Sequence, residues 1–420
     1  MNAMQRTNTI LLVPTEAEEQ ELHALADASA QLWNMANYER RQAYFTAGRV
    51  PSYENQWRTF KDSEPFKRIG TCKGQALLLK LREAWGSFSA LKHLQKLDQL
   101  PPHIKRISPP KYMKDRNTRR RKAEAIYVRN DGYRQQDNTL VLSKNLRIRF
   151  RAGGLWLGKQ GRLELHYDPL RKKWYGHIPV KVKWPRKGNG TPHHSTLKRA
   201  SIDLGICNLT TCAIEGGDRA YVYSGRAVLS DWRYWTKRIA SYESTLKKTN
   251  QRDSSKHLSR LYRTRRRRLN HAVKAMLRDL YDRLEAHGVT DLIVGDLKHI
   301  RDNANHGKVG NQKLHNFWPF MQIRQRIREL GEEYNIRVRF KSERGTSKHC
   351  SLCGEKHKNG RKHRGLYHCK TRNILMNADV NGAYNILYRC RKVAAGSGSR
   401  PMAWPMLLKW NSQEWDVSAA

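Results

Sequence analysis

The chain has 420 residues and is 38% hydrophobic, which is enough for several cores and suggests roughly three domains. Its 81 Lys and Arg residues against 37 Asp and Glu give a formal net charge of +44, and nucleic acid is the natural partner for such an excess. No stretch approaches the ~20 apolar residues of a membrane span, and the first apolar run is too short for a signal peptide. We therefore expect a cytoplasmic, nucleoid-associated protein with no membrane partner.

The N-terminal region begins with a strand that leads into helices. Residues 8–14 predict the strand, and Thr15 with Glu18 forms a capping box in front of a helix. Apolar residues then recur at helical spacing, so we expect a helical module over residues 15–100.

A β-rich region follows this module. Between about 120 and 185, apolar and polar residues alternate at period two, with turn residues between the runs. We expect a β-barrel built from residues 1–14 and 101–195, into which the helical module is inserted.

The C-terminal half alternates strands with helices, the pattern of an α/β layer with a mixed sheet. We assign this layer to residues 196–344 and 376–393, interrupted by a Cys/His segment at 345–375. Residues 394–420 are expected to form a flexible tail. One helix of the layer carries Arg265, Arg266, Arg267 and Arg268 on all sides of a turn, which favours contacts with phosphate groups.

Two acids lie where a hard cation could bind. Asp203 ends the short apolar strand of IDLG, and Asp379 stands just before the apolar helix of NADVNGAYNIL. Mg²⁺ prefers one or two carboxylates together with phosphate oxygens and water. The alternative is a structural role for each acid, in a turn or as a helix cap.

The Cys/His segment has the spacing of a zinc site. Cys350 and Cys353 form C-x₂-C, and Cys369 follows after 15 residues. The fourth ligand is open among His357, His363 and His368, of which we select His368. The alternative is a degenerate loop that binds no metal.

Taken together, D-L-G, G-D-L, T-S-x-x-C-x-x-C and N-A-D-V-N-G resemble the RuvC-like half of TnpB proteins. These are insertion-sequence-encoded, RNA-guided DNA endonucleases related to compact type V CRISPR effectors. The resemblance covers about 200–390, and the N-terminal half matches in architecture only. It implies an α+β multidomain fold: a β-barrel wedge domain with an inserted helical recognition module, then an RNase H-like α/β domain carrying a zinc-finger-like insertion.

The resemblance also implies a function. Three acids would bind two Mg²⁺ ions and hydrolyse DNA phosphodiesters, a guide RNA would select double-stranded target DNA, and the insertion would hold Zn²⁺. The family's first acid corresponds to Asp203 and its last to Asp379. Its middle acid should stand at position 295, where this chain has Gly295.

Three interpretations of Gly295 are open. Asp296 could replace the missing acid, although a neighbour in a strand points to the opposite face. The acid could instead come from Glu343, at the end of the next strand, which is the interpretation we prefer. The third is an inactive nuclease, against which stands the cost of keeping Asp203 and Asp379 as a like-charge pair.

A second departure concerns Arg372 and Asn373, where the family usually has a second Cys and a Gly. Other functions also stay open: a nuclease-inactive RNA-guided regulator, a compact type V CRISPR effector, or a basic RNA-binding protein without guided activity. The sequence does not indicate the oligomeric state.

Overall fold

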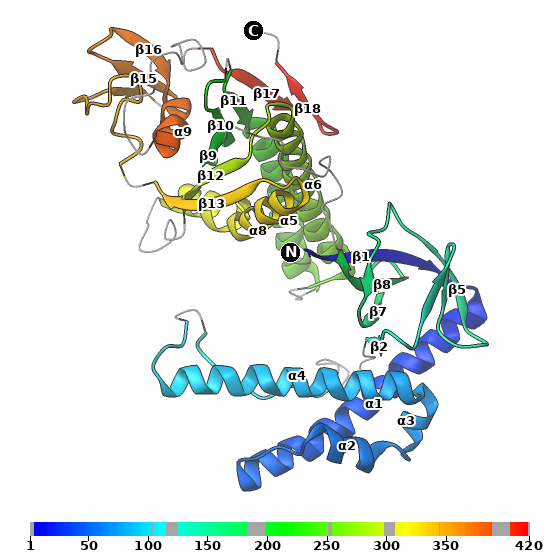
Figure 1. Ribbon diagram of the computed structural model, residues 1–420. Coiled ribbons are helices and arrows are strands. Elements are labelled where there is room, and N and C mark those ends of the chain that lie inside the picture. The colour runs from blue at the N-terminus through cyan, green and yellow to red at the C-terminus, as the bar shows by residue number, and fades with distance from the viewer. Residues whose placement is uncertain are drawn as a thin grey trace. The chain divides into compact units, whose positions relative to one another are not determined.

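The computed structural model describes residues 4–101, 104–114, 125–182, 198–217, 219–250, 254–297, 307–343, 345–363, 365–388 and 404–418. It divides the chain into two compact units, Met1–Trp184 and Pro185–Ala420 (Figure 1). Parts of three predicted segments lie outside the described residues. They include residues 183–195 of the predicted β-barrel, residues 389–393 of the predicted α/β layer and residues 394–403 of the predicted tail. Within the described part, no helix combines the length and hydropathy needed to cross a bilayer.

The first unit is organised around its first strand. β1 (Met4–Val13) pairs with β8 (Lys173–Val182) along most of its length, from Met4 opposite Val182 to Leu11 opposite Tyr175. On its other edge β1 pairs with β5 (Arg147–Arg151). The first strand of the unit therefore lies between two strands that come after the helices in the chain. The helices are thus inserted between strands of one sheet.

The remaining strands complete an eight-stranded antiparallel sheet in the order β2-β7-β8-β1-β5-β4-β3, with β6 paired to β8. These strands are β2 (Ile126–Val128), β3 (Arg134–Gln136), β4 (Thr139–Val141), β6 (Lys159–Gln160) and β7 (Leu163–Asp168). The end strands β2 and β3 are not paired with each other in the described ranges. The expected barrel is thus seen as an open sheet.

Four helices pack with this sheet in one shared core: α1 (Glu16–Ala47), α2 (Tyr53–Phe60), α3 (Glu64–Ile69) and α4 (Thr71–Lys96). The predicted capping box is present, because the amide of Glu18 donates to Thr15 Oγ1 and the amide of Thr15 donates to the Glu18 carboxylate. Trp85 of α4 is buried, and its indole N–H donates to Asn37 Oδ1 of α1 at 2.9 Å. This bond satisfies a buried polar group where the two long helices meet.

The second unit contains a seven-stranded mixed sheet in the order β13-β12-β9-β10-β11-β17-β18. β9, β10 and β11 are antiparallel, whereas β12 and β13 continue the sheet in parallel from β9. The strands are β9 (Arg199–Leu204), β10 (Asn208–Ile214), β11 (Tyr221–Ser224), β12 (Asp291–Asp296), β13 (Arg337–Ser342), β17 (Met406–Trp410) and β18 (Trp415–Val417).

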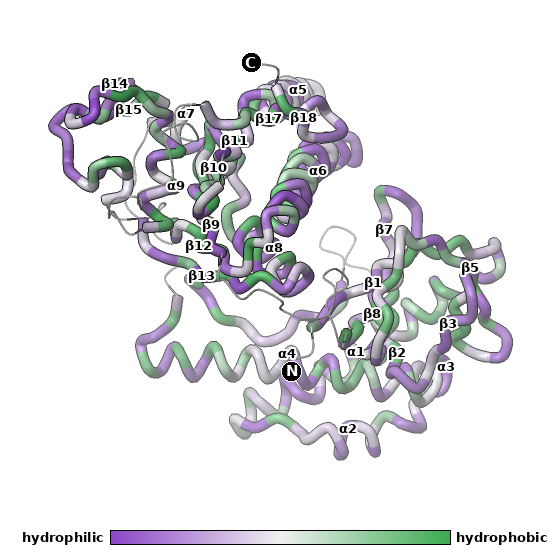
Figure 2. The backbone as a smooth tube through the Cα atoms, turned by 45° about the horizontal axis from the view of Figure 1, so that its top comes forward, coloured by the Kyte–Doolittle hydropathy of each residue, from purple (hydrophilic) through white to green (hydrophobic). Residues whose placement is uncertain are grey.

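Helices cover both faces of this sheet. Successive side chains of a strand point to opposite faces, and apolar side chains of these strands lie on both. Ile202, Cys212 and Tyr223 join a core with α5 (Arg226–Asn250), α6 (Lys256–Ala286) and α8 (Phe320–Glu333), whereas Ala213 and Val222 join a core with α9 (Ala378–Tyr388). Figure 2 shows how hydrophobic and hydrophilic residues mix along α6, as expected for a helix with one buried face. Two short elements, α7 (Gly307–Gln312) and a π-helical turn, η1 (Lys313–Phe317), precede α8.

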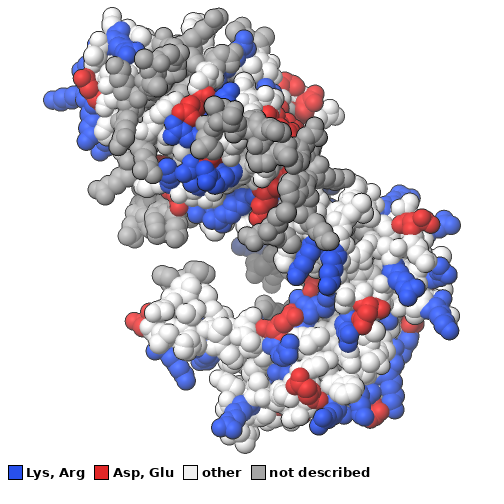
Figure 3. All heavy atoms as spheres, viewed as in Figure 1, with Lys and Arg blue, Asp and Glu red and all other residues white. Residues whose placement is uncertain are grey.

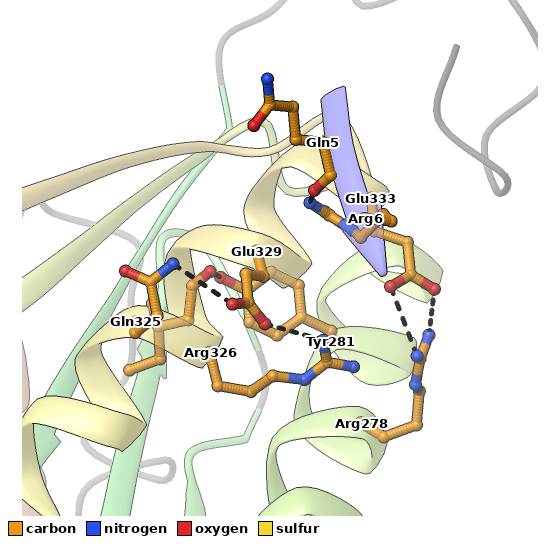
Figure 4. A network of polar contacts seen from close by, with 9 residues as sticks. Gln5, Arg6, Arg278, Tyr281, Gln325, Arg326, Glu329 and Glu333 are labelled. Carbon is orange, nitrogen blue, oxygen red and sulfur yellow. Dashed lines mark hydrogen bonds and ion pairs between the residues drawn. The ribbon is translucent and has the colours of Figure 1, made fainter. Parts of the chain in front are cut away.

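Polar contacts fix α6 against α8 (Figure 4). The carboxylate of Glu333, whose residue is 3% exposed, forms an ion pair with Arg278 at 2.6 Å. The hydroxyl of Tyr281 donates to the carbonyl of Ile327, also at 2.6 Å. A buried carboxylate without such a partner would be costly, so the pair fixes how the two helices meet.

The tail was predicted to be flexible, and for residues 404–418 this prediction is wrong. β17 pairs in parallel with β11, from Tyr221 opposite Met406 to Ser224 opposite Lys409, and β18 pairs with β17. The sequence MLLKW lacks β-branched residues, so it does not read as a strand. The buried side chains of Leu408 and Trp415 stabilise it against the sheet and α6.

We expect Trp415→Ala to lower the free energy of unfolding by about 3 kcal/mol, the usual loss for a buried tryptophan. The ring is 6% exposed, packs against Tyr223 and Trp410, and donates its N–H to the carbonyl of Ala272. Urea denaturation of the full chain measures the change. Val417→Ala in the same strand, 51% exposed, should change it by less than about 0.5 kcal/mol. Equal effects of the two substitutions would contradict a packed β18.

Candidate active site

Two of the predicted acids meet at one edge of the second sheet. Asp203 lies near the end of β9, and Asp379 lies in the first turn of α9, which packs on β9 and β10. Gly382, one helical turn after Asp379, allows this approach, since a Cβ there would lie 2.8 Å from Asp203 Oδ2. Both acids line one cleft of about 240 Å³.

Asp379 is held by residues from three directions. Asn208, the first residue of β10, donates to Asp379 Oδ2 at 2.7 Å. Arg361 of β14 lies 3.4 Å from Oδ1. Asn377 Oδ1 accepts from the amides of Asp379 and Val380 and so caps α9. The carboxylate is therefore oriented by an amide and a guanidinium, on a helix whose start is fixed.

Glu343 occupies the space that a side chain at position 295 would need. A Cβ built on Gly295 would overlap Oε1 of Glu343, so the carboxyl group lies directly over the glycine. Strand β13 ends at Ser342, one residue before Glu343, and the alternation of faces no longer applies there. An acid from the neighbouring strand thus fills the position of the missing acid.

Asp296 has a different partner. It is the last residue of β12, and its carboxylate forms an ion pair with Arg324 of α8. The Arg324 guanidinium also lies over the ring of Phe340, 3.9 Å from its centroid. Because adjacent residues of a strand point to opposite faces, Asp296 is directed toward α8.

The acids raise one another's pKa. Burial raises the pKa of Asp203 to about 7, aided by the charge of Asp379 and opposed by Arg361. Burial raises the pKa of Glu343 to about 8, aided by Asp203 and Asp296. In addition, Glu343 Oε1 is buried and has no hydrogen-bond partner among the described residues.

This arrangement fits hard cations. Asp203 and Asp379 line one cleft, the carboxyl group of Glu343 interacts electrostatically with Asp203 and has an unsatisfied buried oxygen, and the nearby Arg361 is a single positive charge. Divalent cations such as Mg²⁺ bind carboxylate oxygens and would favour the ionised form of each acid. Asp203, Glu343 and Asp379 are the residues that would hold them.

A second candidate metal site lies in the Cys/His segment. One ligand atom from each of Cys350, Cys353, His357 and Cys369 lies within 4.8 Å of the others. Burial raises the pKa of the Cys350 thiol to about 12, so a cation is needed to hold it as a thiolate. Three thiolates and one imidazole are a common donor set for structural zinc.

The segment around these ligands is a small three-stranded sheet of β14 (Arg361–His363), β15 (Leu366–Cys369) and β16 (Ile374–Asn377). His368, the predicted fourth ligand, is not in the cluster. It neighbours Cys369 in β15 and therefore points to the other face, where its Nε2 lies 3.0 Å from Asn373 Oδ1. His363 is likewise outside the cluster.

Arg372 and Asn373, where the sequence departs from the pattern of the zinc segment, have simple local explanations. Arg372 is exposed and is not one of the clustered residues. Asn373 has a φ of 49°, in the left-handed region that glycine favours and asparagine tolerates better than most residues. His357 lies with the three cysteines and would be the fourth donor of a metal site, in place of a cysteine at 372.

The four arginines of α6 divide into two pairs. Arg265 donates to Thr236 and lies over the rings of Trp232 and Tyr262, and Arg268 forms an ion pair with Asp231. These two hold α6 against α5. Arg266 and Arg267 are exposed and form no ion pair with other described residues, so they are free to contact phosphate groups. On the face in Figure 3, Lys and Arg side chains are spread over both units, with acids among them.

Sequence reasoning missed Asn208, Arg361 and Arg324. Asn208 could have been suspected, because the tight turn after D-L-G returns the chain to the end of β9. Arg361 and Arg324 reach the site through tertiary packing, and no local pattern marks them.

Comparison with known proteins places the chain among relatives. The family model described as "Probable transposase" matches residues 177–301, and that described as "Cas12f1-like, TNB domain" matches residues 320–386. TnpB-like protein ORF457 of Acidianus two-tailed virus is 34% identical over 426 residues, covering 95% of this chain and 90% of that protein. A TnpB-like protein of Aquifex aeolicus (strain VF5) is 33% identical over 121 residues, covering 27% and 39%.

Solved structures share the fold. The protein of a Cas12f1-sgRNA-target DNA complex matches with a TM-score of 0.56 and 12% identity, covering 92% of this chain and 99% of that chain. The mini-RNA-guided endonuclease CRISPR-Cas_phi3 matches with a TM-score of 0.50 and 11% identity, covering 94% of each. The chain thus has the α+β fold of these compact effectors.

We expect the stability of the protein without Mg²⁺ to fall as the pH rises toward 8. Asp203 and Glu343 have raised pKa values of about 7 and about 8, so the folded state binds more protons than the unfolded state. Stability is then full below the unfolded pKa values and is lost as the pH rises through the folded ones. Melting temperatures between pH 5 and 8.5 measure this.

Glu343→Gln should flatten that pH dependence, and Mg²⁺ should raise the melting temperature most at the alkaline end. An identical slope in the wild-type protein and in Glu343→Gln would refute the buried, coupled carboxylates.

We expect the purified protein to carry about one zinc ion per chain, the content of one four-ligand site. His357→Ala should lose zinc on dialysis against a chelator, because it removes one of the four donors. His368→Ala, in the same segment but outside the cluster, is the matched control and should retain the metal. Elemental analysis decides, and loss only in His368→Ala would restore the original assignment.

Proposed function

Because the chain belongs to the TnpB family, we propose that it is an RNA-guided DNA endonuclease that hydrolyses phosphodiesters with divalent cations held by Asp203, Glu343 and Asp379. The observation that carries this proposal is Glu343, whose carboxyl group fills the space over Gly295. A chain that had lost its nuclease would have no reason to keep Asp203 and Glu343 buried in this cluster at the energetic cost that the raised pKa values of these two residues represent.

In this proposal each unit has a distinct task. The first unit, with its sheet and the helices α1 to α4, corresponds to a wedge domain that holds a recognition module. The second unit corresponds to an RNase H-like, RuvC-type nuclease domain. The Cys/His segment between β13 and α9 is its zinc-finger-like insertion.

The catalytic cations are proposed to be two Mg²⁺ ions. When bound, they supply Lewis acidity at the scissile phosphate and make water a better nucleophile at neutral pH. The unpartnered Oε1 of Glu343 and the carboxylates of Asp203 and Asp379 are the protein's oxygen donors for them.

Neighbouring residues prepare the site. Asn208 donates to Oδ2 of Asp379 and Arg361 lies near Oδ1, so neighbours orient both oxygens of this carboxylate. Arg361 lines the same cleft and presents a guanidinium that can bind a phosphate oxygen. Trp318, 2% exposed, forms a rigid apolar wall of the cleft. Together they orient the acids and narrow the space in which a DNA strand can lie.

Guide RNA and double-stranded target DNA are the proposed partners. The Cas12f1 structure with the same fold is a complex with sgRNA and target DNA. In guided effectors base pairing reads the target, while the protein grips the heteroduplex through its backbone. The net charge of +44 suits that grip, and Arg266 and Arg267 are exposed candidates for it.

The test is plasmid cleavage with Mg²⁺ and the RNA that co-purifies with the protein. Glu343→Gln should reduce the cleavage rate at least 100-fold, because it removes a charge that the cations need. Asp296→Asn is the matched control. It lies one residue from Gly295 but pairs with Arg324, and should keep cleavage within about fivefold of wild type.

Full cleavage by Glu343→Gln together with loss in Asp296→Asn would reverse the assignment of the third acid. Gly295→Glu combined with Glu343→Gly returns the acid to β12 and should recover part of the activity lost in Glu343→Gln. Guided DNA binding without cleavage by the wild-type protein would instead support the nuclease-inactive regulator.

A further inference from the structure

A second cavity, of about 510 Å³, adjoins the cleft of the acids, because Asn208 lines both. We call it the β17 cavity, after the strand that supplies much of its wall. Its polar and aromatic lining is Asn208, Ser224, Arg226, Asn377, Lys409 and Trp410. Its volume is that of an ordinary pocket for a small ligand and accommodates a group the size of one nucleotide.

The wall nearest the acids is formed by the residues that hold Asp379. Asn208 donates to the carboxylate of Asp379, and Asn377 caps the helix on which Asp379 lies. If a phosphate group of a nucleic-acid strand lies at Asp203 and Asp379, only Asn208 separates that phosphate from the β17 cavity. The next nucleotide of the strand therefore lies beside this cavity.

The chemistry of the cavity suits a nucleotide. Arg226 and Lys409 are exposed, and neither side chain pairs with an acid among the described residues. Both are thus available for a phosphate group. Trp410 is half-buried and braced by His271 and Trp415, which keeps its ring in place at the cavity.

Trp404, which precedes the cavity-lining Pro405, offers an additional flat aromatic surface. Trp404 is 77% exposed, and Pro405, the next residue, lines the cavity. An exposed aromatic side chain of this size is unfavourable in water and is typical of surfaces on which bases stack. The tail that carries Trp404, Lys409 and Trp410 therefore supplies both kinds of contact that a single strand needs.

We propose that the β17 cavity binds the nucleotide next to the scissile phosphate in the DNA strand being cut. This inference rests on the proposed nuclease function and adds a subsite to it, which positions the strand. Arg226 and Lys409 hold the phosphate group, and the tryptophans contact the base.

The first test reverses both charges with Arg226→Glu/Lys409→Glu. The two residues are exposed, so the fold should persist. At subsaturating target we expect cleavage to fall at least tenfold and to depend less steeply on salt, with guide RNA binding unchanged. Lys256→Glu/Arg260→Glu is the matched control. These residues are exposed at the far end of α6, about 24 Å (Lys256) and about 18 Å (Arg260) along the helix from Ala272, whose carbonyl contacts Trp415.

The second test does not depend on activity. Target DNA carrying 4-thiothymidine at the nucleotides that flank the cut is irradiated in complex with the wild-type protein and guide RNA, without Mg²⁺. We expect crosslinks in the peptide that contains residues 404–418. Crosslinks only outside this peptide, or wild-type cleavage by Arg226→Glu/Lys409→Glu, would each overturn the inference. Absence of cleavage by the wild-type protein, with the crosslink present, would refute the nuclease and leave the β17 cavity standing.

Discussion

The crowding of negative charge at one edge of the second sheet is the constraint around which the rest of this unit is built. Burial and mutual repulsion raise the pKa of Asp203 to about 7 and that of Glu343 to about 8, and a single arginine compensates only in part. Glycines at 295 and 382 leave the space that these carboxyl groups occupy. The fold thus maintains a site that is unfavourable by itself and becomes favourable when cations bind.

The rest of the chain has the opposite electrostatic character. A net charge of +44 surrounds an acidic cleft, so the surface attracts a nucleic acid whose phosphate groups the cleft by itself would repel. Divalent cations bound at the acids would remove this conflict, because they are attracted both to the carboxylates and to a phosphate group. Long-range attraction of nucleic acid therefore depends on the Lys and Arg residues of the surface, whereas the proposed chemistry depends on the acids of the cleft.

The sequence was informative where function depends on local pattern. The capping box at Thr15 is present, and Asp203 and Asp379 do share one cleft. Glu343 was the preferred replacement for the missing acid, and its carboxyl group reaches the space over Gly295 because β13 ends at Ser342 and strand alternation does not extend past a strand end.

Spacing could not select the fourth ligand of the cysteine cluster. The direction in which a histidine points depends on the register of β15, and this register places His368 away from Cys350 and Cys353. Nor could local pattern reveal β17, whose residues become a strand by packing against the sheet. Tyr221 of β11 pairs with Met406 of β17. During synthesis, β11 therefore has no partner on this edge until nearly all of the second unit has been translated. A ribosome-bound chain therefore exposes the open edge of β11 beside an incomplete β17 cavity, and the wall of this cavity is completed only when β17 and β18 emerge.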